Sequence, residues 1–451
     1  MNMDLWATLD NSNKEQAPDA GELLKAQGQR RRLTEAVVLA VVREWLLREY
    51  VAAYGRSLAS IRIFRRCYWI DGLGVDARGR EQVVEMIGEI GQILAGGSRP
   101  IALRGMVLKA GGSRRREGRE AEGKGAATVK LPEGSGVVDA GWLEAQAALL
   151  QAIEQAPAIF LLNPFGQTLF GYDDLAPLYQ RTGPTELFLL LPHKQLGSHL
   201  LAASEAGSAS AGALTNLLRS DRWKSLLAGA NLNGADNKNG TGNDKGKGAA
   251  GLLRQGVQEA APSPLSSSSS LPMLPAGAID GLVELFIASM KARFLTVQRI
   301  ALPVQVGAAA VEQAPYTLLF ATRRQDSLAI MNDAVCAYQR RISAQSYQGV
   351  LGEEWFAQQE RERLAAEQQE LEQLVSASGM ARNTGRPRRW PELRQHLLLT
   401  HFGRWPLQEY DAIMCQLLKN GSVRCEWRRK TAPDGTNTER VPGDEDMLFW
   451  K

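Results

Sequence analysis

The clearest indication of the fold lies in residues 67–79, Cys67-Tyr68-Trp69-Ile70-Asp71-Gly72-Leu73-Gly74-Val75-Asp76-Ala77-Arg78-Gly79. Its first four residues form a short apolar run that is typical of a buried strand, and Asp71-Gly72 ends that run. A helical pattern follows over about 81–94, and a second strand is expected over 101–108. A strand, a glycine-rich turn, a helix and a second strand in this order predict the first unit of a parallel sheet.

The same alternation continues along the chain. An apolar strand over 158–162 precedes Asn163-Pro164-Phe165-Gly166, and the continuous apolar run over 186–191 is typical of a strand buried on both faces. A further strand is expected over 316–322, and helices are expected over 142–155, 173–180, 279–294, 327–344 and 353–375. We therefore predict an α/β fold with a Rossmann-like parallel sheet between two layers of helices.

Composition places the chain among soluble globular proteins, since its 451 residues are 44% hydrophobic and carry a net charge of only +4. A polar leader (1–30) and two polar, glycine-rich inserts (about 110–136 and 229–276) interrupt the pattern. We predict a Rossmann-like domain over 31–350, a charged connecting helix and linker over 351–385, and a small domain over 386–451.

Several classes of protein are excluded by the cysteines, the histidines and the hydropathy. None of the four cysteines forms a CxxC pair and the four histidines show no metal spacing, so no metal site is expected. No apolar run reaches the roughly 18 residues that a membrane helix needs, and the acidic, polar start is unlike a signal peptide. We expect a cytoplasmic protein with reduced cysteines and no membrane partner.

Two predicted strand ends carry the candidate site. Asp71, Gly72 and Gly74 form a turn of the kind that holds nucleotides, in which glycines let backbone N–H groups approach the ligand and the acid accepts a hydrogen bond from an amine or hydroxyl. The same residues also fit a plain tight turn between a strand and a helix. Asn163, Pro164 and Phe165 resemble segments that bind exocyclic amines in methylating enzymes, with the aromatic residue stacked on a base, and they also fit a common Asn-Pro turn.

The C-terminal segment predicts a winged helix-turn-helix. Helices are expected over 390–399 and 406–419, and two antiparallel strands over 423–429 and 447–450. Residues 386–451 hold 12 Lys and Arg against 9 Asp and Glu. Seven of these cations cluster at the two edges of the segment and are candidates for binding the phosphates of a nucleic acid: Arg386, Arg388, Arg389, Arg424, Arg428, Arg429 and Lys430. A packing module with a solvated basic face is the alternative.

Four stretches together resemble the three-Cys-motif partner (TcmP) family of bacteria and archaea. They are residues 43–54 with the strand and turn at 67–72, the strand and turn at 159–166, the segment 316–333 (YTLLFATRRQDSLAIMND), and the C-terminal segment. The resemblance implies a methyltransferase-type Rossmann fold, S-adenosylmethionine as cofactor, and a three-Cys-motif protein encoded nearby as partner. The chain departs from the family pattern at the glycine turn, at Asn163 in place of Asp, and at Leu108-Lys109, where an acid would bind the ribose of the cofactor.

Two functions follow from the resemblance. In the first, the protein is a methyltransferase that acts on nucleic acid: Asp71, Gly72 and Gly74 hold the cofactor, and Asn163, Pro164 and Phe165 position the acceptor amine. In the second, the fold has lost its chemistry, and the protein is an adaptor that binds nucleic acid or a partner protein. The altered turn and the missing ribose acid favour the second function.

Overall fold

The computed structural model describes twelve segments of the chain. They are residues 35–74, 77–109, 129–205, 208–228, 274–275, 277–300, 303–306, 310–313, 316–346, 353–381, 387–428 and 440–450. The predicted leader and most of both predicted inserts lie outside these segments. Gly136, which was assigned to the first insert, instead begins a short strand of the central sheet.

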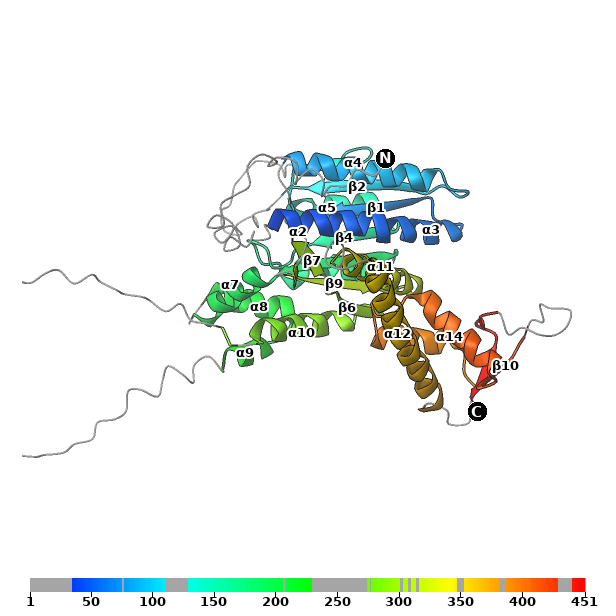
Figure 1. The fold of residues 1–451 in the computed structure, drawn as a ribbon. Helices are drawn as coiled ribbons and strands as arrows, with labels where there is room; N and C mark the ends of the chain where they lie inside the picture. The colour runs from blue at the N-terminus through cyan, green and yellow to red at the C-terminus, as the bar shows by residue number, and fades with distance from the viewer. Residues whose placement is uncertain are drawn as a thin grey trace, which may run out of the picture.

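The core of the molecule is a seven-stranded sheet (Figure 1). Its spatial order is β3 (Gly136–Val138), β2 (Ala102–Leu108), β1 (Arg66–Asp71), β4 (Ala158–Leu162), β5 (Thr185–Pro192), β9 (Tyr316–Thr322) and β6 (Thr296–Ile300). Neighbouring strands from β3 to β5 are parallel, so the predicted α/β fold around a central parallel sheet is confirmed for these strands, and the arrangement is compatible with a Rossmann-like fold.

Strand β9 departs from the predicted all-parallel sheet, because it runs antiparallel to both β5 and β6. Only 15 residues separate Ile300 from Tyr316. Their described part forms the hairpin β7 (Pro303–Val306) and β8 (Ala310–Gln313) rather than a helix. A parallel neighbour needs a crossover connection, usually a helix, whereas an antiparallel strand can return directly.

Alternate residues of the strands bury into two cores, one on each face of the sheet. Phe160 and Leu162 join the core under α5 (Trp142–Ile153), α6 (Tyr172–Gln180), α7 (His193–Ser204), α8 (Ala209–Leu218) and α10 (Ala278–Lys291). Ile159 and Leu161 join the core under α2 (Glu35–Trp45), the π-helical turn η1 (Leu46–Val51), α3 (Ala52–Ser60), α4 (Ala77–Ala95) and α11 (Gln325–Ser346). The two helical layers that were predicted are therefore present. A short 3-10 turn, η2 (Arg222–Lys224), and α9 (Ser225–Ala228) complete the helices before α10.

The C-terminal unit has a core of its own. It consists of α12 (Glu353–Ala381), α13 (Trp390–Thr400), α14 (Leu407–Lys419) and the antiparallel pair β10 (Val423–Glu426) and β11 (Met447–Trp450). Leu371 and Val375 of α12 are buried in this core with Trp390 and Trp405, so α12 packs as part of the unit and is more than a connector. The two helices and the strand at 447–450 match the sequence prediction, whereas the strand predicted over 423–429 ends at Glu426; the winged-helix assignment stays a prediction.

Candidate functional site

The two predicted strand ends lie side by side at the carboxyl edge of the sheet. Strands β1 and β4 are parallel neighbours, with Asp71 opposite Leu161. Asp71 and Gly72 therefore meet the start of Asn163-Pro164-Phe165. The strand order reverses between these two strands, since β2 and β3 follow on one side of β1 and β5 follows on the far side of β4. A reversal of this kind is where open α/β sheets bind their ligands.

Asp71 is committed to a buried ion pair at this point. Its Oδ2 accepts a hydrogen bond from Nε of Arg43 (2.5 Å), and its Oδ1 accepts from a second guanidinium nitrogen of Arg43 (3.2 Å) and from the backbone N–H of Leu73 (3.1 Å). The Asp71 and Arg43 side chains are 0% and 2% exposed. Both carboxylate oxygens are thus engaged within the protein.

Arg43 is the functional neighbour that the sequence reasoning missed. It lies on α2, 28 residues before Asp71, and it also donates to the carbonyl of Gly74 (3.4 Å). One feature of the sequence could have indicated it: Arg43 is a single arginine on an otherwise apolar helical face that also carries Val42 and Trp45. The side chains of Val42, Arg43 and Trp45 are all buried. A charged side chain in such a position needs a buried partner of opposite charge.

The glycines of the turn serve packing and backbone geometry. A Cβ at Gly72 would lie 2.5 Å from Cδ2 of Leu162, so the absence of a side chain lets Leu162 pack against the turn. Gly74 has a φ of 68°, in the left-handed region that glycine adopts without strain. Val75 and Asp76, which follow in the turn, lie outside the described residues.

The Asn163-Pro164-Phe165 segment is a closed turn in this structure. The Asn163 side chain accepts a hydrogen bond from the N–H of Phe165 (3.0 Å) and donates to Oε1 of Gln195 (2.9 Å). Pro164 is buried, and its carbonyl accepts from the N–H of Phe170 (2.9 Å). The ring of Phe165 is 0% exposed and packs edge-on against Phe286, so it presents no face on which a base could stack.

A lysine and an acid follow the neighbouring strands β2 and β3. Lys109 follows β2, where an acid would bind a ribose, and its Nζ lies 4.0 Å from a carboxylate oxygen of Asp139, the residue after β3. Arg80 lies 3.8 Å from the same oxygen. Two described positions of the carboxyl edge therefore do not fit S-adenosylmethionine: the acid of β1 is paired internally, and a lysine stands at the end of β2, where the ribose hydroxyls need an acceptor.

A buried carboxyl lies elsewhere in the sheet, on β5. Glu186 is fully buried and its Oε1 accepts a hydrogen bond from the Ser327 hydroxyl (2.9 Å), whereas its Oε2 meets no hydrogen-bond donor among the described residues. Burial raises the pKa of Glu186 from 4.5 to about 7, although the nearby hydroxyl groups of Thr322 and Ser327 act in the opposite direction. The sequence reasoning assigned no role to this residue, because it starts a run that is otherwise apolar.

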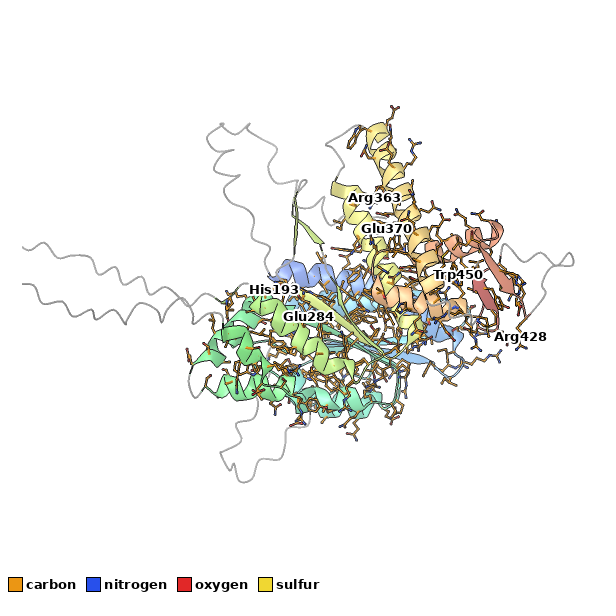
Figure 2. The ribbon with its side chains drawn as sticks, turned by 90° about the horizontal axis from the view of Figure 1, so that it is seen from below. His193, Glu284, Arg363, Glu370, Arg428 and Trp450 are labelled. Carbon is orange, nitrogen blue, oxygen red and sulfur yellow. The ribbon has the colours of Figure 1, made fainter. Side chains whose placement is uncertain are left out.

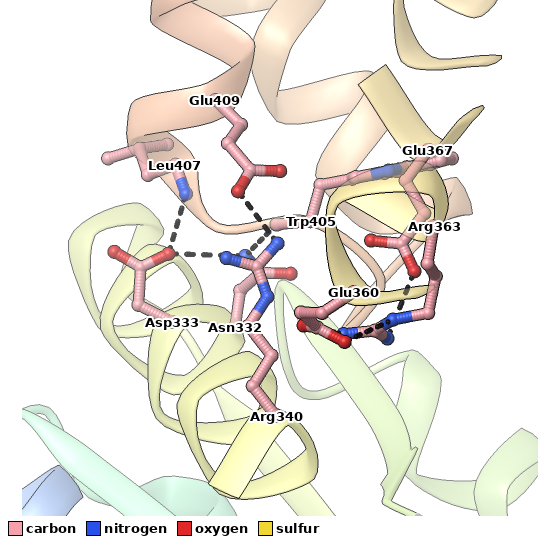
Figure 3. Close-up of polar contacts among 9 residues, drawn as sticks. All are labelled: Asn332, Asp333, Arg340, Glu360, Arg363, Glu367, Trp405, Leu407 and Glu409. Atoms are coloured by element: carbon pink, nitrogen blue, oxygen red, sulfur yellow. Dashed lines mark hydrogen bonds and ion pairs between the residues drawn. The ribbon is translucent and has the colours of Figure 1, made fainter. Parts of the chain in front are cut away.

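The stretch 316–333, the most specific part of the family resemblance, ends at the contact with the C-terminal unit (Figure 3). Asn332 of α11 is fully buried; its side chain donates to the carbonyl of Trp405 (2.7 Å) and accepts from the N–H of Gly403 (2.8 Å). Asp333 accepts from the N–H of Leu407, the first residue of α14 (2.7 Å). These side chains hold the turn between α13 and α14 against the α/β domain.

Replacing Asn332 by alanine is expected to loosen the C-terminal unit. The change leaves a buried N–H and a buried carbonyl without partners, at a cost of about 2 kcal/mol. Amide hydrogens of α13 and α14 should exchange with solvent roughly 30-fold faster, while those of β4 and β5 keep their rates. Asn420→Ala, at an exposed position after α14, is the control. Equal exchange in both variants would mean that Asn332 does not anchor the unit.

The C-terminal structure brings both edges of the predicted basic cluster together. Arg388 forms a backbone bridge with Leu448 of β11, and β11 pairs with β10, which carries Arg424. Arg389, Arg424 and Arg428 are exposed, and Figure 2 shows Arg428 at the outer end of the molecule.

Arg424 lies over the ring of Phe449 and is paired with Glu426 (3.0 Å). Arg386, Arg429 and Lys430 lie outside the described residues.

Comparisons with known proteins add no identification: no family model, no curated protein and no solved structure matches the chain. Among the residues that the structure describes, no group of three or more His, Cys, Asp or Glu side chains is placed to hold a metal ion. Within that same part of the chain, every helix is too short or too polar to cross a membrane.

Proposed function

We propose that this protein is a nucleic-acid-binding adaptor built on a methyltransferase-type Rossmann fold, related to the three-Cys-motif partner family. The observation that carries the proposal is the buried ion pair between Arg43 and Asp71. It engages the carboxylate that the cofactor's amine would need, and a carboxylate so enclosed is not available to a ligand without breaking the pair.

The sheet supports the methyltransferase-type part of the proposal. The order β3-β2-β1-β4-β5 is that of a doubly wound parallel sheet, the sheet of the Rossmann fold that the resemblance implies. Here β9 is antiparallel to its neighbours β5 and β6, and it stands between them. The glycine turn after β1 and the polar turn after β4 also occupy the edge where such folds hold ligands.

The binding role rests on the C-terminal unit. Two helices followed by an antiparallel strand pair suit a winged helix, and the exposed Arg389, Arg424 and Arg428 are guanidinium groups that pair with phosphate oxygens in bidentate fashion. The anchor through Asn332 and Asp333 supports a fixed geometry between this unit and the α/β domain. A fixed geometry suits an adaptor that presents a bound strand to the partner protein that the resemblance implies.

Methyl transfer from S-adenosylmethionine is the second candidate function. The strand order favours methyl transfer because it places a ligand crevice at the carboxyl ends of β1 and β4. The left-handed backbone of Gly74 favours it because a cofactor-binding turn needs this conformation. This function requires that Asp71 break its ion pair with Arg43 and bind the amine of the cofactor instead.

Calorimetric titration distinguishes the two functions. Titrating the full-length protein with S-adenosylmethionine is expected to give no binding heat up to millimolar ligand, because Asp71 is paired and Lys109 replaces the ribose acid. A fluorescently labelled 20-nucleotide RNA should nevertheless bind the same sample, and removing Arg389, Arg424 and Arg428 together should weaken it. Micromolar binding of S-adenosylmethionine, lost in Asp71→Ala, would overturn the adaptor proposal and favour methyl transfer.

A further inference from the structure

A second basic surface lies at the opposite edge of the sheet from the candidate site. A hollow of about 280 Å³ opens there between the loop before β1 and the loop before β2. Its lining residues are Ala59, Arg62, Phe64, Arg65, Arg99, Pro100 and Ile101. We call this group the amino-edge hollow. Three of its seven lining residues are arginines, and all three are exposed.

The charge of this surface is unusually one-sided. Residues 56–66 contain four arginines and residues 96–104 contain two, and neither stretch contains an acid. This local charge of +6 exceeds the net charge of the whole chain, +4. Within the described part of the chain, no ion pair neutralises Arg62, Arg65 or Arg99. Uncompensated cations around a concave surface attract anions.

The backbone around the amino-edge hollow is held in place. A guanidinium nitrogen of Arg99 donates to the carbonyl of Ser60 at the end of α3 (3.2 Å), and the N–H of Ala102 donates to the carbonyl of Arg65 (2.9 Å). The N–H of Phe64 donates to the carbonyl of Ile61 (3.2 Å). The arginines therefore project from two loops whose backbones are tied to each other and to the start of the sheet, and the Arg99 side chain is held against the end of α3, so the backbone positions of the three arginines are set before a ligand arrives.

The amino-edge hollow lies at the same end of the molecule as the C-terminal unit. In Figure 1, the end of α3 and the helices α12 and α14 all lie toward the right. The contacts agree: Ser57 of α3 donates to Asp326 of α11 (2.6 Å), and Leu328, one turn or less further along α11, is buried in the core of the C-terminal unit. Asp326 itself is paired with Arg324 and leaves the nearby cations uncompensated.

We infer that the amino-edge hollow binds the phosphodiester backbone of the nucleic acid strand, through Arg62, Arg65 and Arg99. This inference rests on the proposed function and adds to it a second contact, on the α/β domain. Guanidinium groups match phosphate oxygens with two parallel hydrogen bonds. Phe64 lines the same hollow and Ile63 is 78% exposed beside it, which provides apolar surface for a base or sugar next to the phosphates.

The test measures binding of a fluorescein-labelled 20-nucleotide single-stranded RNA to the full-length protein by anisotropy, between 50 and 200 mM salt. The variant Arg62→Ala/Arg65→Ala/Arg99→Ala is expected to bind at least tenfold more weakly. Its binding should also depend less steeply on salt: the negative slope of log K against log salt should shrink in magnitude by about 2, because three phosphate contacts are lost. Arg62→Ala/Arg65→Ala, which keeps the Arg99 bond to Ser60, should give an intermediate loss. Lysine at all three positions keeps the charge and should recover only part of the affinity.

A variant that removes three exposed cations elsewhere, Arg222→Ala/Lys224→Ala/Lys291→Ala, is the matched control and should bind as the unchanged protein does. If the hollow variants bind normally while loss of Arg389, Arg424 and Arg428 abolishes binding, the inference is wrong and the proposed function stands. If the unchanged protein binds neither RNA nor duplex DNA, both the inference about the hollow and the proposed function are wrong. Competition by polyglutamate as strong as by RNA would assign the hollow to an acidic protein and overturn the inference.

Discussion

Replacing Arg43 by methionine is expected to remove about 3–5 kcal/mol of folding stability, measured by urea unfolding at pH 7. The methionine fills much of the volume of the arginine stem, but it leaves the Asp71 carboxylate buried without its counter-charge. Asp71 is 0% exposed, so water cannot replace the lost guanidinium. The expected loss is a large part of the stability of an ordinary domain.

Two further variants separate the ion pair from simple packing. Arg48→Met removes a half-exposed arginine one turn later, which pairs with Glu44 at 3.0 Å, and should cost less than about 1 kcal/mol. Adding Asp71→Asn to Arg43→Met removes the buried charge and keeps an acceptor for the N–H of Leu73, so most of the lost stability should return. If Arg43→Met costs no more than Arg48→Met, then Asp71 is solvated and available to a ligand.

Replacing Glu186 by glutamine is expected to change how stability depends on pH. Burial raises the pKa of Glu186 from 4.5 to about 7, so between these values the folded state keeps a proton that the unfolded state has released. Stability from this group is therefore fully present below pH 4.5 and falls as the pH rises, by about 1.4 kcal/mol per pH unit and by roughly 3 kcal/mol in all at pH 7. Glutamine stays neutral, so Glu186→Gln should be the more stable protein at pH 8 and should show little of this decline.

The measurement is the free energy of unfolding in urea at intervals from pH 4.5 to pH 8. Glu81→Gln, at an exposed position on α4, is the control and should follow the unchanged protein throughout. Parallel curves for Glu186→Gln and the unchanged protein would show that folding does not raise the pKa of Glu186. The isosteric amide can still accept the hydrogen bond from Ser327 and so keeps the local packing.

Much of the fold could be predicted because its signals are local. The apolar run over 158–162 matches β4 without a change of boundary, and the runs at 101–108 and 316–322 match β2 and β9 within one residue. The strand ends at Asp71 and Asn163 could also be placed together, because parallel strands bring their carboxyl ends to one edge. The direction of β9 was not predicted, because a short apolar run has the same residue pattern in a parallel strand as in an antiparallel one.

The alternation of strands and helices, and the polar residues at the ends of β1 and after β4, follow from residues that are close in the chain, and so they could be predicted from the sequence. The contacts of those residues depend on the packing of distant elements. The tertiary structure paired Asp71 with Arg43 on another element, buried the ring of Phe165 against Phe286, and joined Arg62 and Arg65 to Arg99 around one hollow. The physical reason is that burial and charge pairing act between groups that are distant in sequence, so they arise only once the helical layers have packed on the sheet.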